Sequence, residues 1–153
     1  MTVKITAERP DTPDAIALIK ELDDTLEPFY PSESRHGFSV DKLLNEGVDF
    51  FVIRVDGRPA GCCGVKFFKE EGFAEVKRMY VRPDSRGQKL AYKMLVYLSE
   101  FVQAKEIDTL RLETGIYQEA AIRLYERFGF VQIPPFGDYF EDPVSRCYEK
   151  RPL

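Results

Sequence analysis

The chain has 153 residues, of which 44% are hydrophobic and 31% charged, and we expect residues 1–153 to form one globular domain. No segment reaches the roughly 18 consecutive apolar residues of a membrane span, and the N-terminus lacks the apolar core of a signal peptide. A net charge of −4 argues against nucleic acid as a partner. Three cysteines and one histidine offer no zinc cluster. We therefore expect a cytoplasmic protein without metal, nucleic acid or membrane contact.

The first third of the chain predicts one strand and two helices. Ile16, Ile19, Leu22 and Leu26 follow helical spacing, with Thr12 or Asp14 as the cap, and Ser39 can cap a second, shorter helix that ends at Gly47. The expected elements are a strand at 3–7, a helix from 14, a polar loop at 32–38 and a helix at 40–45.

The centre of the chain predicts an antiparallel meander of three strands. Asp56-Gly57 is a strong hairpin signal, and Glu70-Glu71-Gly72 makes a second turn. The adjacent cysteines Cys62 and Cys63 lie in an apolar run, as small core residues do. The three expected strands are 50–55, 60–68 and 73–81.

The last third alternates helices with strands. A helix is expected to begin near Gly87, with one apolar stripe formed by Leu90, Met94, Leu95, Leu98, Phe101 and Val102. After it come a strand at 109–113, a helix at 119–128 and strands at 130–133 and 145–149. The order β-α-α-β-β-β-α-β-α-β-β indicates an α/β protein with one mixed sheet and helices packed on it.

A basic block coincides with the strand-to-helix turn after residue 81. Between residues 77 and 93 there are six basic residues and a single acidic one, Asp84. The start of a helix presents unpaired N–H groups and the positive end of the helix dipole, which favours an anion such as phosphate. An ordinary capped helix with a solvated basic first turn fits the same spacing.

Residues 75–91 are similar to the signature segment of the GCN5-related N-acetyltransferases, the GNAT family. That family's pattern is Arg/Gln-x-x-Gly-x-Gly/Ala at the start of a helix; Arg86 and Ala91 fit it, and Lys89 stands where Gly is usual. The resemblance implies that Met79, Tyr80 and Val81 pair with the pantetheine arm of acetyl-CoA. It also implies a pyrophosphate cradle made of Arg86, Gly87, Gln88, Lys89, Leu90, Ala91 and Tyr92.

A second motif supports the same family. Gln118-x-x-Ala121-x-x-x-Tyr125-x-x-x-Gly129-Phe130 resembles a GNAT helix motif, with Gln118 in place of the usual Asn. Segments 112–115 and 134–139 are similar to those of bacterial small-molecule acetyltransferases. The resemblance implies the GNAT fold, a mixed, mostly antiparallel sheet of six to seven strands with helices on both faces. It also implies acetyl-CoA as co-substrate.

Acetyl transfer to an amine needs a base for the amine, a donor for the oxyanion and a proton for the CoA thiolate. Glu75, on the signature strand where some family members carry a catalytic Glu, is the candidate base; an exposed carboxylate, an ion-pair partner of Lys77 or proton removal through water are the alternatives. Tyr125 matches the family tyrosine that points at the thioester sulfur, although it also fits a core stripe. The oxyanion donor is expected to be a backbone N–H near Met79 or Tyr80.

Several residues are candidates for contact with the acceptor. Candidate contacts are Arg35, His36, Arg78 and Tyr139, with Arg111 as a further one. Arg35 or Arg78 in the pocket would suit an acceptor with a carboxylate, such as an amino acid. We expect direct attack by the primary amine of a small molecule in a ternary complex. A protein or peptide acceptor, a non-catalytic acyl-CoA sensor and a homodimer remain open alternatives.

Overall fold

The structure, a computed structural model, describes residues 1–35 and 38–153, and its centre is a seven-stranded sheet of order β1-β2-β3-β4-β5-β7-β6. All neighbouring strands are antiparallel except β4 and β5, which are parallel, so the expected mixed, mostly antiparallel sheet is confirmed. In chain order the elements are β1 (Val3–Ala7), α1 (Pro13–Leu26), the 3₁₀ helix η1 (Ser32–Ser34), α2 (Val40–Asn45), β2 (Asp49–Val55), β3 (Arg58–Phe68), β4 (Phe73–Val81), the 3₁₀ helix η2 (Pro83–Ser85), α3 (Leu90–Ala104), β5 (Leu110–Gly115), α4 (Glu119–Phe128), β6 (Val131–Ile133) and β7 (Ser145–Lys150).

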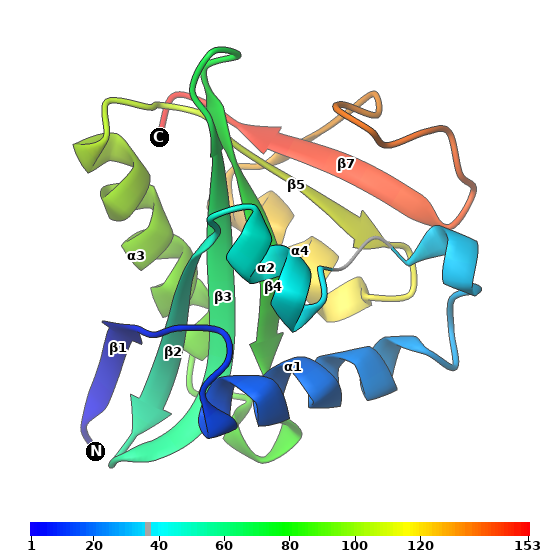
Figure 1. The fold of residues 1–153 in the computed structure, drawn as a ribbon. Coiled ribbons are helices and arrows are strands. Elements are labelled where there is room, and N and C mark those ends of the chain that lie inside the picture. The colour runs from blue at the N-terminus through cyan, green and yellow to red at the C-terminus, as the bar shows by residue number, and fades with distance from the viewer. Residues whose placement is uncertain (36–37) are drawn as a thin grey trace.

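Helices cover both faces of the sheet. Figure 1 shows α1 and α2 in front of it and α3 and α4 behind it. Each pair of helices has its own hydrophobic core. Leu95 and Leu98 of α3 pack with Leu112 and Tyr125 on one face, whereas Leu18 and Leu43 pack with Val52 on the other. Side chains of successive strand residues alternate between these two cores.

Local sequence signals explain where several elements begin. The Thr12 hydroxyl accepts the N–H of Ala15 at 3.2 Å and caps α1, and the Ser39 hydroxyl accepts the N–H of Lys42 at 3.2 Å and caps α2. Asp56 and Gly57 have φ values of 49° and 83°, the left-handed pair that a tight hairpin turn requires. These predicted boundaries and turns are confirmed, and Cys62 and Cys63 are both fully buried.

Four local expectations differ from the structure. Ile16 lies 45% exposed, because α1 buries Ala15, Leu18, Ile19 and Leu22 instead. The helix expected near Gly87 begins at Leu90, since the η2 turn and two left-handed residues, Gly87 and Lys89, occupy the chain before it. The polar loop at 32–38 contains the 3₁₀ helix η1, and the strand expected at 109–113 runs from Leu110 to Gly115.

Candidate active site

The parallel strands β4 and β5 separate part of the way along their length. Their ladder consists of Ala74 opposite Leu110 and Glu75 opposite Arg111. Beyond Glu75 the two strands diverge, and Figure 1 shows α4 in the opening between them. A strand edge without a partner leaves backbone N–H and C=O groups available for an extended ligand.

A bulge in β4 bends the strand at this opening. Gly64 and Cys62 of β3 lie opposite Lys77 and Tyr80, so two steps along β3 correspond to three along β4. The bulged segment contains Arg78, whose φ is 51°. Because a bulge adds one residue to the strand, the side chains after it point to the face opposite to the one that simple alternation would give. Lys77 and Arg78 therefore both point toward α1, and Met79 packs against the core on the α4 side.

A pocket opens at this divergence, and elements from both faces of the sheet line it. One wall comes from α1, the segment after it and the loop before β7, and the opposite wall comes from α4. The lining residues are Leu22, Leu26, Tyr30, Ser34, Arg35, Glu75, Val76, Lys77, Arg78, Met79, Leu112, Glu113, Thr114, Gly115, Gln118, Ala121, Tyr125 and Tyr139.

Tyr125 lines the pocket from the α4 side. Its ring is buried and packs edge-on against Phe130 at 5.7 Å, and its hydroxyl lies 3.9 Å from the sulfur of Met79. Burial raises the pKa of the Tyr125 phenol. The phenol therefore keeps its proton at neutral pH and can donate it to a group that develops negative charge beside Met79.

Glu75 belongs to a buried network of three side chains. Its Oε2 accepts a hydrogen bond from the Tyr139 hydroxyl at 2.5 Å and lies 3.0 Å from Nζ of Lys77. Lys77 also lies 3.0 Å from the Tyr139 oxygen and 3.9 Å from the centre of the Phe38 ring. Burial lowers the pKa of Lys77. Glu75 thus lines the pocket while Oε2 holds Lys77 and Tyr139 in place.

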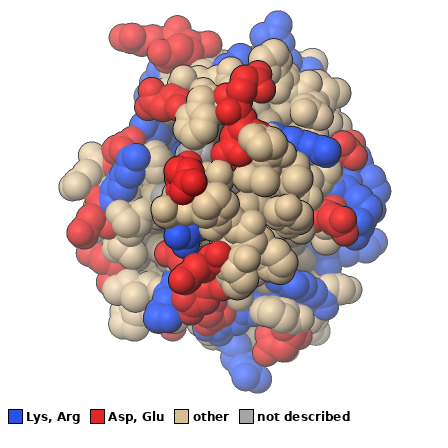
Figure 2. Space-filling model, turned by 90° about the vertical axis from the view of Figure 1, so that its right-hand side faces the viewer, with Lys and Arg blue, Asp and Glu red and all other residues tan. Residues whose placement is uncertain are grey.

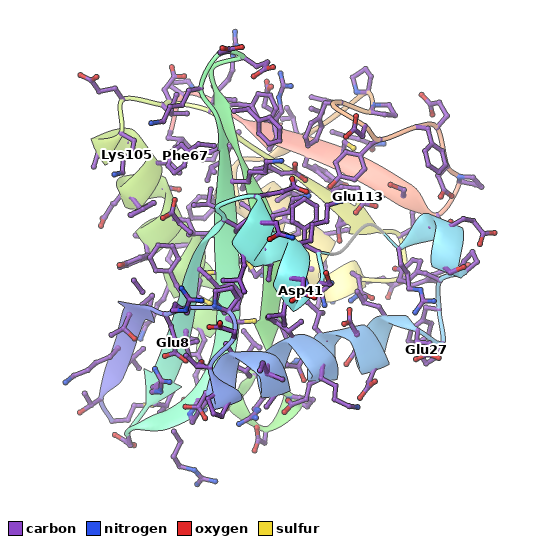
Figure 3. The ribbon with its side chains drawn as sticks, viewed as in Figure 1. Glu8, Glu27, Asp41, Phe67, Lys105 and Glu113 are labelled. Atoms are coloured by element: carbon purple, nitrogen blue, oxygen red, sulfur yellow. The ribbon has the colours of Figure 1, made fainter. Side chains whose placement is uncertain are left out.

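Glu113 is a second carboxylate in the pocket, and the sequence analysis did not assign it a role. It lies on β5, and its Oε2 accepts a hydrogen bond from the Ser145 hydroxyl at 2.6 Å. Burial raises its pKa to about 7. Figure 3 labels it in the middle of the molecule beside β5. The usable signal was the alternation of Leu110 and Leu112, which predicts that Glu113 points to the opposite face.

The turn before α3 presents backbone N–H groups to solvent. Gly87 and Lys89 have φ values of 85° and 59°, and the first intrahelical bond is the 3.0 Å bond from the N–H of Lys93 to the carbonyl of Lys89. The N–H groups of the first turn of a helix have no acceptor within that helix. Arg86 and Lys93 supply positive charge beside them. An anion fits this turn.

Only part of the basic block belongs to that anion site. Lys77 lies in the pocket network, and Arg78 reaches back to α1, where its guanidinium donates to Asp23 at 2.5 Å and to the Ile19 carbonyl at 3.3 Å. Arg82 is paired with Glu21 at 2.7 Å. The clustering in sequence therefore overstates the charge at the turn, which comes from Arg86, Lys89 and Lys93.

The expected acceptor residues divide into three groups. Arg35 lines the pocket with an exposed side chain and has no ion-pair partner among residues 1–35 and 38–153. Arg78 and Tyr139 line it as well, although both bond to neighbouring protein groups. Arg111 does not line it, because Glu149 holds it at 2.8 Å. His36 lies outside the described residues.

The remaining cofactor candidates lie on the same side as Tyr125 or beside the bulge. Gln118 is the N-cap residue of α4 and lines the pocket, and its side chain makes no capping hydrogen bond. Tyr80 and Val81 continue the free edge of β4, although the Tyr80 side chain points toward α1 and its hydroxyl donates to Glu21 at 3.2 Å. Their backbone groups are therefore the ones available at the opening.

Two loops meet at the pocket wall that contains Ser34 and Arg35. The Ser34 hydroxyl of η1 donates to Asp142, in the loop before β7, at 2.6 Å. Nearby, the Tyr30 hydroxyl accepts the N–H of Tyr117 at 2.9 Å, and a side chain at Gly115 would collide with the Tyr30 ring. Figure 2 shows this end of the molecule as an uncharged central area bordered by acidic and basic residues. The Ser34–Asp142 bond, which we call the clasp, ties η1 to the loop before β7, and Ser34 itself lines the pocket.

No described helix combines the length and apolar composition needed to cross a membrane. Among residues 1–35 and 38–153, no three or more His, Cys, Asp or Glu side chains are grouped so that they could hold a metal ion.

Comparison with known proteins gives the same family as the motifs. An IAA acetyltransferase from Azospirillum brasilense is 38% identical over 148 residues, covering 97% of both chains. A Klebsiella pneumoniae crystal structure, described by name as an acyl-CoA N-acyltransferase, has a TM-score of 0.84 at 37% identity and covers 99% of both chains. The PaiA N-acetyltransferase of Thermoplasma acidophilum, solved with coenzyme A, shares the fold with a TM-score of 0.77 at 22% identity, covering 98% of this chain and 99% of that one.

These relatives are named acyltransferases, which favours an enzyme over a non-catalytic sensor. The model of the acetyltransferase (GNAT) family matches residues 16–130, which include the divergent strands, the turn before α3 and Tyr125. The chain therefore belongs to the GNAT family of N-acetyltransferases.

Proposed function

We propose that this N-acetyltransferase transfers an acetyl group from acetyl-CoA to the primary amine of a small molecule that carries a carboxylate, such as an amino acid. The observation that carries the proposal is the pocket at the β4–β5 divergence. Tyr125 stands on one side of it, and Arg35 and the clasp stand on the other.

The donor is held on the α4 side of the pocket. The pantetheine arm pairs with the free β4 edge at Met79, Tyr80 and Val81, as an added strand would. The pyrophosphate lies on the turn before α3, where first-turn N–H groups meet the charges of Arg86 and Lys89. The thioester then lies near the sulfur of Met79, within reach of the Tyr125 hydroxyl.

Tyr125 gives its proton to the CoA thiolate as the thiolate leaves. Its raised pKa keeps the phenol protonated until charge develops on the sulfur. A backbone N–H at the bulge, near Met79 or Tyr80, donates to the oxyanion. The amine attacks directly in a ternary complex, because amine and thioester occupy opposite sides of one opening.

The acceptor enters from the α1 side. Leu22 and Leu26 offer apolar contact for the body of the acceptor, and Arg35 offers a cation for its carboxylate. The clasp favours a small acceptor over a protein chain, since it ties together two segments at the pocket wall that a polypeptide would have to pass. The name of the Azospirillum relative, an IAA acetyltransferase, also favours a small molecule.

The test is release of CoA thiol from acetyl-CoA against matched acceptors. The panel pairs each amino acid with the amine that lacks its carboxylate and adds peptides with free N-termini and lysine side chains. We expect turnover of an amino acid, a lower kcat/KM for the matched amine and no turnover of peptides. Arg35→Gln should lower kcat/KM for the amino acid about tenfold or more and change it little for the matched amine.

Two outcomes would overturn the proposal. Peptide turnover without amino-acid turnover would assign the protein acceptor instead. An equal loss of kcat/KM for both members of a pair in Arg35→Gln would remove Arg35 from carboxylate recognition. Arg58→Gln, at the start of β3 and away from the pocket lining, is the matched control for loss of a surface arginine.

A further inference from the structure

Glu113 points to the face of the sheet from which the acceptor enters. Its neighbours Leu110 and Leu112 lie in the core beneath α3 and α4, and strand side chains alternate, so Glu113 lies on the α1 side. It lines the same pocket as Tyr125, which reaches the opening from the α4 side. A carboxylate and a phenol thus approach the β4–β5 opening from opposite faces of the sheet.

This placement suits a base and an acid for one transfer. The amine must lose protons on the acceptor side, and the thiolate must gain one on the CoA side. Glu113 occupies the first position and Tyr125 the second. Figure 3 labels Glu113 beside the β5–β7 part of the sheet.

The Glu113 carboxylate is held through one oxygen. Ser145, the first residue of β7, donates to Oε2 at 2.6 Å, and Oε1 has no protein partner among the described residues. Glu75 differs, because its Oε2 is shared by Lys77 and Tyr139 in a buried ion pair. Of the two pocket carboxylates, Glu113 therefore has the oxygen that can take up a proton without breaking a salt bridge.

The surroundings of Glu113 set its proton affinity. Burial is the largest effect and raises its pKa to about 7, the Ser145 bond and Lys77 oppose this rise, and Glu75 and Asp142 add to it. The other titratable groups that face it are Tyr30, Tyr125, Tyr139 and Cys147. Arg111, on the same face of β5, is bound by Glu149, and Arg35 stands in the same pocket wall. A base with a pKa near the working pH is suited to accept a proton and return it to solvent.

We propose that Glu113 is the general base of the acetyl transfer and that Glu75 positions Lys77 and Tyr139 in the pocket wall. The inference rests on the proposed function. The acceptor ammonium loses two protons in all. One passes to the Glu113 carboxylate and then to solvent. The C–N bond forms, the C–S bond breaks, the thiolate takes the Tyr125 proton, and the second amine proton restores the phenol.

The test is the pH dependence of kcat/KM for the acceptor in the wild type and three variants. We expect wild-type activity to fall on the acid side with a midpoint near 7, where Glu113 becomes protonated. Glu113→Gln should lower kcat/KM by 10²-fold or more and remove this limb, while acetyl-CoA still raises the melting temperature. Gln can accept the Ser145 hydrogen bond, so the pocket wall is retained.

Ser145→Ala distinguishes a base from a merely structural Glu113, because only a base would shift the acid midpoint of kcat/KM. The Ser145 hydroxyl stabilises ionised Glu113, so its loss should move the acid midpoint upward with activity kept above it. Glu75→Gln removes a neighbouring negative charge and should move the midpoint downward while the limb persists. Glu71→Gln, in the exposed β3–β4 turn, serves as the control and should leave the profile unchanged.

The outcomes separate this inference from the proposed function. An unchanged midpoint in Ser145→Ala, or a Glu113→Gln enzyme that keeps its acid limb, would overturn Glu113 as base with the acetyltransferase intact. Loss of the limb in Glu75→Gln alone would assign the base to Glu75. Wild-type protein that releases no thiol with any amine would instead reject the proposed function.

Discussion

Lys89 shows how a single departure from the family pattern is accommodated. The position before α3 needs a left-handed residue, and Lys89 takes it with a φ of 59°. Glycine has no Cβ and adopts this conformation without steric cost, whereas other L-residues pay about 1–2 kcal/mol. The sequence alone showed the substitution, and the structure shows its consequence. The turn keeps its shape at the expense of backbone strain.

We predict that Lys89→Gly raises the free energy of unfolding by about 1 kcal/mol, since relief of strain outweighs the entropy that glycine adds to the unfolded chain. Urea denaturation measures the change. Lys89→Ala, which removes the same charge and keeps the strain, should give no such gain. Equal stability of the two variants would show that the strain at this turn does not exceed the entropic cost of glycine.

Tyr125→Phe tests the proton donor without changing the packing of the ring. The ring packs on Phe130, and that contact survives the substitution. We expect kcat to fall by about 10²-fold, with the Kd of acetyl-CoA nearly unchanged, because only the proton delivered to the thiolate is lost. Steady-state kinetics and calorimetric titration measure the two quantities. Unchanged kcat would reduce Tyr125 to a core residue.

Glu113 also predicts a change of stability with pH. Its pKa in the fold is about 7, above the ordinary 4.5, so the native protein holds a proton that the unfolded chain releases between these values. Stability from this group is fully present below about pH 4.5 and is lost as the pH rises through about 7. Urea unfolding of wild type and Glu113→Gln from pH 5 to 8 should show a decline that the variant lacks. Parallel curves would contradict the raised pKa.

At the scale of elements, the sequence predicted nearly every strand and helix, including the Asp56-Gly57 hairpin and both serine and threonine caps. These features depend on neighbours in the chain, so local patterns suffice for them. The bulge at Arg78 was not predicted, because the alternation of side chains along β4 does not mark the residue at which their direction changes. That bulge turns Arg78 toward α1, away from the turn before α3. The alternation of Leu110 and Leu112 is enough to place Glu113 on the opposite face, but it does not show that this face lines a pocket.

The clasp is the element-scale feature that we expect to set acceptor size. Ser34→Ala removes the hydroxyl that bonds to Asp142 and should raise KM for small acceptors several-fold without changing KM for acetyl-CoA. It should also improve turnover of bulkier amines. Ser32→Ala, at the exposed start of the same 3₁₀ helix, is the control. An equal change in KM for both substrates would show that the clasp supports the fold rather than the acceptor wall.

At the scale of the whole molecule, the pocket exists because two strands of the sheet, β4 and β5, separate. Antiparallel pairing on either side holds β4 to β3 and β5 to β7, so the parallel pair can open beyond Glu75 while the sheet stays continuous. Helices on both faces then bring an acid from one side and an acceptor wall from the other. Element order predicted the layers, whereas the opening depends on contacts between residues far apart in the chain. This opening is where we propose that acetyl transfer takes place.

A crystal structure of the protein with CoA tests this account most directly. We predict the pantetheine arm along Met79 to Val81, the pyrophosphate on the N–H groups before α3, and the thiol sulfur within hydrogen-bond distance of the Tyr125 hydroxyl. CoA bound away from the β4–β5 opening, or a sulfur far from Tyr125 with the arm in place, would contradict it.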